Sequence, residues 1–218
     1  MKRILIITLA LLSLVLNVSA KIHTIGDSTM ADYDQTEPDQ KGMYGWGQVF
    51  GDYFCNGMTV KNWGDRGESA RSFYRKFWSK TKAEIKKGDY VLIQFGHNDQ
   101  KSVTTDVYRE YLSRFICETR ELGATPILVT SICRKLFEGT KLSRLGRIDN
   151  GKAYGVDENN HTYDYPYHMK KVADSLKVEC LDLTTACKEY MESWGPEGCK
   201  QFFPSGGSTH TNELGARV

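Results

Sequence analysis

Short, almost wholly apolar runs alternate along the chain with longer segments of mixed polarity. The runs cover residues 21–25, 58–62, 89–95, 125–132 and 178–183. The segments between them predict helices over residues 45–54, 69–78, 80–86, 105–122, 166–176 and 184–193. Strands that are apolar throughout and alternate with helices are typical of a parallel sheet covered on both faces. The sequence therefore predicts an α/β fold, a three-layer α/β/α sandwich around a five-stranded parallel sheet.

Between the fourth and fifth runs, residues 133–163 are polar and have no regular period, which predicts a long loop. About two hundred residues suit one sizeable domain. An apolar content of 40% is enough for a real core.

The N-terminus has the three parts of a secretory signal peptide. Lys2 and Arg3 precede the apolar residues 4–16, and the small residues 18–20 follow them. A membrane anchor is the alternative, but the apolar run is shorter than the roughly 20 residues that span a bilayer. We therefore expect a signal peptide at residues 1–20, no stable membrane anchor, and a secreted or periplasmic domain over residues 21–218.

Charge and cysteine content limit the classes of partner and ligand that we expect. The chain has 29 Lys and Arg against 27 Asp and Glu, and removal of Lys2 and Arg3 leaves 27 of each. A neutral domain gives no sign of nucleic-acid binding. The six cysteines form no CxxC pair, and no other metal-ligand pattern is present, so we expect no metal and no cofactor. A bridge between Cys187 and Cys199 is the favoured disulfide. The sequence does not predict the oligomeric state.

Three polar turns follow the first three predicted strands. They contain Ser28, the segment 62–67 and the string "GHND", residues 96–99. Open parallel sheets bind ligands beyond the carboxyl ends of their strands, so these turns are expected to meet on one rim.

Acyl transfer needs a nucleophile, a base and donors for the developing oxyanion. Ser28 is a candidate nucleophile and His210 a candidate base. Gly67 offers a bare backbone N–H, and Asn98 offers a side-chain amide. Each residue alone has an ordinary structural explanation, because serine and asparagine are common in turns and helix caps. Their combination in this order favours an esterase site.

The strings "GDST", "GHND" and "THTN", together with the segment around Gly67, resemble the four blocks of the SGNH (GDSL-type) hydrolases. The fuller strings "NWGDRGESARSF", "FGHNDQK" and "TSICRK" resemble its rhamnogalacturonan acetylesterase branch. The resemblance covers essentially the whole chain after residue 20 and implies a flavodoxin-like fold.

The resemblance also implies roles for individual residues. Ser28 is expected to attack the ester carbonyl, and His210 to take up and return its proton. The oxyanion is expected to lie against the N–H groups of Ser28 and Gly67 and the amide of Asn98. The family pattern has an aspartate three residues before the histidine, where this chain has Gly207. The family would also continue a closing helix beyond Val218, so the resemblance implies a domain shortened at its C-terminus.

The segment 134–152 carries six basic and two acidic residues. One interpretation is a solvated surface loop. The other is a clamp for a galacturonate-containing polysaccharide, with Arg134, Arg144 and Arg147 binding carboxylates.

Two classes of function remain open from the sequence. The first is an esterase that removes acetyl groups from plant cell-wall polysaccharide such as rhamnogalacturonan or pectin, with acetylxylan or another acyl ester as its alternative substrate. The second is an inactive relative that binds glycans. An intact Ser28 and His210 favour the first class, and Gly207 favours the second.

Overall fold

A computed structural model describes residues 20–55, 58–149 and 164–218. Five parallel strands form one sheet: β1 (Lys21–Gly26), β2 (Thr59–Asn62), β3 (Tyr90–Gln94), β4 (Thr125–Val129) and β7 (Glu179–Leu181). The order is β2-β1-β3-β4-β7, the flavodoxin-like arrangement. The predicted fold class and all five predicted strands are confirmed, with ends shifted by a few residues.

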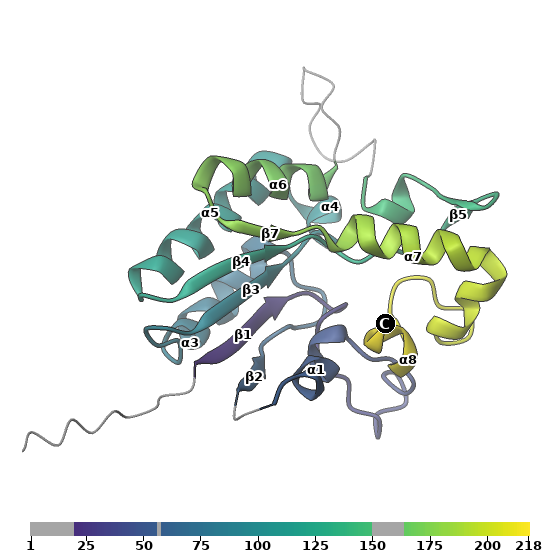
Figure 1. The fold of residues 1–218 in the computed structure, drawn as a ribbon, viewed down its shortest axis with the longest axis horizontal. Helices are drawn as coiled ribbons and strands as arrows, with labels where there is room; N and C mark the ends of the chain where they lie inside the picture. The colour runs from purple at the N-terminus through teal and green to yellow at the C-terminus, as the bar shows by residue number, and fades with distance from the viewer. Residues whose placement is uncertain (1–19, 56–57, 150–163) are drawn as a thin grey trace, which may run out of the picture.

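Helices cover both faces of this sheet (Figure 1). On one face lie α5 (Thr105–Glu121), α6 (Tyr165–Leu176) and a helical stretch made of α2 (Ala70–Phe73), η2 (Tyr74–Trp78) and α3 (Ser79–Lys82). On the other face lie α1 (Trp46–Phe50), α7 (Leu183–Gly198) and α8 (Glu213–Arg217). The shorter elements are η1 (Gly51–Tyr53), α4 (Asp99–Ser102), β5 (Phe137–Glu138), β6 (Lys141–Leu142), η3 (Leu145–Arg147) and η4 (Cys199–Phe202).

Strand β3 shows how the two layers divide the apolar side chains. Val91 and Ile93 enter the main core with Phe115 of α5, whereas Leu92 faces the opposite side. This alternation follows from the two-residue period of a strand. A strand apolar at every position therefore buries both of its faces, as the sequence predicts.

The expected loop over residues 133–163 is in part ordered structure. Strands β5 and β6 form a two-stranded antiparallel hairpin, and its turn contains Gly139 with φ of 62°. Phe137 and Leu142 of the hairpin pack against Met191 of α7. This hairpin has little signal in the sequence, because each strand has only two residues. Residues 150–163 lie outside the described residues.

The predicted Cys187–Cys199 bridge is wrong, since all six cysteines are free thiols. Cys187 lies against Cys133, and the backbone N–H of Cys133 donates to the Sγ of Cys187 at 3.3 Å. The thiol of Cys199 instead donates to the carbonyl of Met191 at 3.1 Å. The two cysteines thus contact different partners on either side of the bend at Gly195 in α7.

Within the described part of the chain, no helix is long and apolar enough to cross a membrane. All but the last residue of the predicted signal peptide lies outside that part.

Candidate active site

The candidate site lies at the carboxyl ends of β1 and β3, where the strand order reverses direction. Ser28 follows β1 directly in a tight turn, in which the N–H groups of Met30 and Ala31 donate to the carbonyl of Asp27. The hydroxyl of Tyr33 donates to the Ser28 carbonyl at 2.8 Å. Ser28 is 8% exposed, so its hydroxyl lies at the base of a cleft.

The structure brings His210 to Ser28, although 182 residues separate them in sequence. Its Nε2 lies 3.0 Å from Ser28 Oγ. The adjacent Thr211 is fixed to Tyr44 by hydrogen bonds of 2.8 and 2.7 Å, and the ring of Tyr33 lies 5.9 Å from the imidazole. A histidine held against a serine hydroxyl has the geometry needed to accept its proton.

Burial lowers the pKa of His210 below its usual value. The charge of Asp27 acts in the opposite direction, while Arg134, Lys101 and Arg66 lower the pKa further. The imidazole is therefore neutral at pH 7 and able to act as a base.

Three N–H donors are available for an oxyanion beside Ser28. Gly67 has φ of 79°, and a side chain at that position would meet no atom within 4 Å. Its glycine is thus required by backbone conformation and not by space. Neither the Ser28 N–H nor the Gly67 N–H donates a hydrogen bond to any residue that the structure describes. The Asn98 amide donates to the carbonyl of Glu68 at 3.0 Å and has a second N–H.

Asp27 is a supporting residue that the sequence analysis missed. It is wholly buried and accepts hydrogen bonds from the N–H and hydroxyl of Thr29, at 2.9 and 2.7 Å, and from the N–H of His97 at 3.3 Å. It therefore joins the serine turn to the loop that carries Asn98. Burial raises the pKa of Asp27, and these donors partly offset that effect. An acidic residue directly after an apolar strand was the available signal.

Two more buried groups shape the loop after β3. The ring of His97 contacts the Ile132 carbonyl through Nε2 at 3.1 Å, and burial holds its pKa well below the usual value. Asp99 accepts from the N–H of Ala70 at 3.0 Å, and burial raises its pKa to about 8. These contacts attach Asn98 to β4 on one side and to the start of α2 on the other.

The cleft around Ser28 has a volume of about 260 Å³. It is cationic, because Arg66, Lys101 and Arg134 line it and no carboxylate from the described residues does. Of the three arginines proposed from sequence, only Arg134 reaches it. Arg144 instead makes two hydrogen bonds to Asp149, at 2.8 and 2.9 Å, and Arg147 is not a lining residue either. The sequence analysis also missed Arg66 and Lys101, whose role depends on where their side chains reach.

Position 207 provides no carboxylate for His210. Gly207 has an ordinary backbone conformation, and its N–H donates to the Pro204 carbonyl at 2.9 Å. A Cβ at this position would lie 3.1 Å from that same carbonyl oxygen, a tight contact. No acidic side chain from the described residues forms a hydrogen bond with His210. Among the residues that the structure describes, Ser28 and His210 therefore form a pair without an acidic third member.

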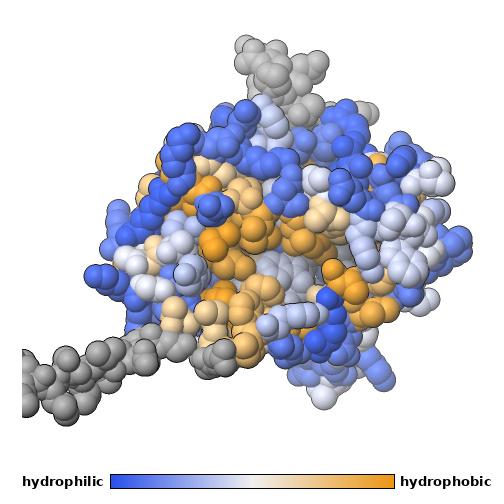
Figure 2. Space-filling view, viewed as in Figure 1, coloured by the Kyte–Doolittle hydropathy of each residue, from blue (hydrophilic) through white to orange (hydrophobic). Residues whose placement is uncertain are grey.

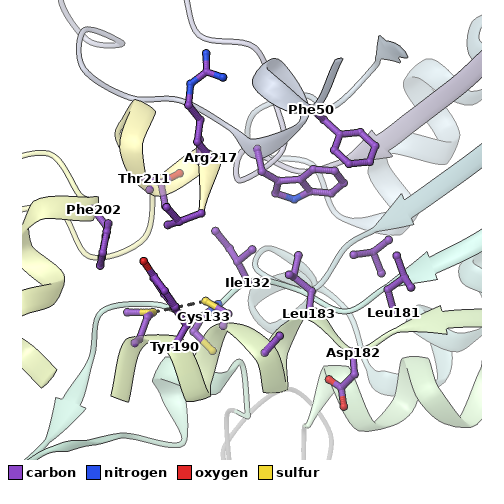
Figure 3. A pocket seen from close by; sticks show the side chains of 18 of the residues that line it. Phe50, Ile132, Cys133, Leu181, Asp182, Leu183, Tyr190, Phe202, Thr211 and Arg217 are labelled. Carbon is purple, nitrogen blue, oxygen red and sulfur yellow. Dashed lines mark hydrogen bonds between the residues drawn. The ribbon is translucent and has the colours of Figure 1, made fainter. Parts of the chain in front are cut away.

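A second and larger cavity lies over β3, β4 and β7, on the face that carries α1, α7 and α8. It has a volume of about 690 Å³ and is lined by apolar side chains that include Phe50, Leu181 and Leu183 (Figure 3). Figure 2 shows the corresponding surface as a hydrophobic hollow. We call this cavity the apolar hollow. It contains neither Ser28 nor His210.

The described residues include no group of three or more His, Cys, Asp or Glu side chains that could hold a metal ion.

Comparison with known proteins identifies the family of this chain. The model of the GDSL-like Lipase/Acylhydrolase family matches residues 24–218. The chain belongs to this family. Membership makes it a serine esterase, and both the Ser28 turn and His210 fall within the matched region.

Two curated relatives and one solved structure share most of their length with the chain. It is 37% identical to the rhamnogalacturonan acetylesterase RhgT of Bacillus subtilis (strain 168), over 90% of this chain and 84% of that protein. It is 30% identical to a rhamnogalacturonan acetylesterase of Emericella nidulans, over 97% of this chain and 87% of that protein. The acetylxylan esterase Axe2 of Geobacillus stearothermophilus has the same fold, with a TM-score of 0.61 and 20% identity over 90% of this chain and 89% of Axe2.

Proposed function

We propose that this protein is a carbohydrate acetylesterase that removes acetyl groups from plant cell-wall polysaccharide of the rhamnogalacturonan or pectin type. The observation that carries the proposal is the 3.0 Å contact of His210 Nε2 with Ser28 Oγ, at the strand-order reversal and beside unpaired backbone donors. The names of the two curated relatives support the substrate class. The predicted signal peptide supports a secreted or periplasmic location, where such polymers are accessible.

The proposed reaction proceeds through an acyl-enzyme. His210 Nε2 takes the proton of Ser28 while Oγ attacks the acetyl carbonyl. The developing oxyanion is stabilised by the N–H groups of Ser28 and Gly67 and by the Asn98 amide. His210 then gives the proton to the departing sugar hydroxyl, and a water activated by the same imidazole releases acetate.

Acetate release from acetylated pectin and from acetylated xylan, measured side by side, tests this proposal. We expect faster release from pectin, and no release from either polymer by Ser28→Ala. Faster release from xylan would move the substrate to the class named for Axe2. No release from any acetate ester would reject the esterase.

One observation favours a second candidate, a glycan-binding protein with no activity. His210 lacks an acidic partner among the described residues, and position 207 is glycine. Loss of the acidic member costs about 10⁴-fold in known serine proteases but leaves catalysis above the uncatalysed rate. Labelling by an organophosphate separates the candidates, because only an activated Ser28 reacts rapidly.

A further inference from the structure

Arg134 is a buried cation in the catalytic cleft with unused hydrogen-bonding capacity. It follows β4 on the same rim as Ser28, and its backbone is fixed by hydrogen bonds to Gly146 and Leu136. Its side chain is nearly enclosed, since the residue is only 8% exposed. One Nη donates to the His97 carbonyl at 3.3 Å, whereas the buried Nε has no partner.

The surroundings of Arg134 do not neutralise it through a direct ion pair. Asp27 is the carboxylate that acts on it, and the oxygens of Asp27 are bonded to Thr29 and His97. The cleft contains two more cations, Arg66 and Lys101, and within the described part of the chain no carboxylate lines it. Arg66 pairs with Asp39 at 3.1 Å near the surface, which leaves Arg134 as the buried, unpaired charge. A buried charge without a partner is costly unless a ligand supplies one.

The charge of Arg134 also opposes the reaction. Transfer of the Ser28 proton makes His210 a cation, and Arg134, Lys101 and Arg66 all disfavour that cation while Asp27 favours it. The aspartate that usually stabilises the imidazolium in serine hydrolases is absent at Gly207. An anion bound to Arg134 would offset the positive charge that disfavours the His210 cation.

We propose that Arg134 is the anion subsite of the cleft, and that a substrate carboxylate bound there takes over electrostatically from the carboxylate missing at position 207. The proposal rests on the proposed esterase function and gives it a specificity residue. A substrate with the required carboxylate is a uronate that carries the acetyl group itself or is linked to a sugar that carries it. Its carboxylate accepts from the guanidinium of Arg134, which lines the cleft. The substrate thereby completes the charge balance of the serine–histidine pair.

This arrangement predicts an effect on turnover as well as on binding. A charged hydrogen bond gained at Arg134 raises kcat/KM by about 10- to 100-fold. Part of that gain is expected in kcat, because neutralisation of Arg134 stabilises the His210 cation in the transition state. With the carboxylate bound, the pKa of His210 also rises. The acid limb of kcat is then expected at higher pH than the acid limb of kcat/KM, which reports the free enzyme.

The test compares acetylated oligogalacturonate with the same oligosaccharide after its carboxyl groups are converted to methyl esters. The acetyl ester and the sugar are unchanged, while each carboxylate loses its charge and gains a methyl group. Wild type is expected to prefer the charged substrate by about 10- to 100-fold in kcat/KM. Arg134→Gln is expected to remove the preference, and Arg134→Lys to keep part of it. Arg144→Gln is the matched control, since that arginine pairs with Asp149 outside the cleft and the preference should remain.

Binding is measured separately from catalysis. Ser28→Ala is titrated by calorimetry with deacetylated oligogalacturonate and with its methyl ester, with and without Arg134→Gln. We expect tighter binding of the charged oligosaccharide only when Arg134 is present. Equal kcat/KM for the two substrates in the wild type, or a preference that survives in Arg134→Gln, overturns the proposal. If no acetate ester is turned over, the esterase function fails, and the binding titration alone still decides whether Arg134 is an anion subsite.

Discussion

The polar cleft at the ends of β1 and β3 and the apolar hollow over β3, β4 and β7 belong to the same sheet but differ in every chemical respect. The hollow is more than twice as large, about 690 against 260 Å³. The cleft nevertheless holds the serine, the imidazole and the cations. Its residues come from turns that follow strands, whereas the hollow is lined by strand faces and helices. Convergent polar groups, and not volume, are therefore the basis on which we propose the cleft as the site of the reaction.

Ser28→Ala has the largest expected effect and tests whether the reaction takes place in the cleft. Removal of the nucleophile is expected to lower turnover of an aryl acetate by about 10⁶-fold, as in other serine hydrolases. Initial rates with purified variants check this, and circular dichroism confirms the fold. Ser193→Ala on exposed α7 is the matched control and should retain wild-type turnover. Equal turnover by wild type and Ser28→Ala would place the chemistry elsewhere.

Gly207→Asp tests whether the cleft is short of one carboxylate. A carboxylate that reaches His210 fixes the tautomer and stabilises the imidazolium, so turnover of an aryl acetate is expected to rise by up to about 10⁴-fold. The backbone at Gly207 is outside the left-handed region, although a Cβ lies 3.1 Å from the Pro204 carbonyl and requires a small shift. Gly207→Asn has nearly the same shape without the charge and should give little or no gain. A folded Gly207→Asp variant with unchanged turnover at every pH would show that His210 needs no such partner.

Asn98→Ala sharpens the assignment of the oxyanion donors. Loss of one donor is expected to lower kcat by about 10²–10³-fold, since the donor acts on charge that develops in the transition state. Michaelis–Menten kinetics on an aryl acetate separate kcat from KM. Asn98→Asp keeps the shape but removes the N–H, and should cost at least as much. A change in KM alone would assign Asn98 to substrate binding.

The strands and the order of the site residues were predictable because their signals are local. A buried parallel strand is rich in apolar residues on both faces, and Ser28 and Asn98 lie in the turns that follow two such strands. The approach of His210 to Ser28 required the resemblance to a family, because no local pattern relates residues 182 positions apart. The pairing of Arg144 with Asp149 was not predicted, because the two residues are near in sequence but meet only through the turn of η3.

The pH dependence of catalysis is expected to respond to charges in the cleft and not to charges elsewhere on the molecule. Burial and three cations lower the pKa of His210, so the neutral imidazole persists below pH 6.5 and the acid limb of kcat/KM is expected there. Lys101→Gln removes one cation, which raises the pKa and moves the limb to higher pH. Lys188→Gln is the control, because this lysine pairs with Glu192 on α7. A pH–rate profile on a neutral aryl acetate is measured for the wild type, Lys101→Gln and Lys188→Gln. An acid limb at or above pH 6.5 in the wild type would contradict the assignment of His210 as base.

The smallest expected effect belongs to the hollow. Leu128 of β4 is wholly buried in the main core, whereas Leu181 of β7 is 52% exposed and lines the hollow. Leu128→Ala is expected to lower the free energy of unfolding by about 2–5 kcal/mol, the usual cost of a cavity in a packed core. Leu181→Ala is expected to change it by no more than about 0.5 kcal/mol and to leave turnover unaltered. Urea denaturation of both variants measures the difference. A loss for Leu181→Ala as large as that for Leu128→Ala would mean that the hollow is filled in solution, and the two faces of the sheet would then be equally covered.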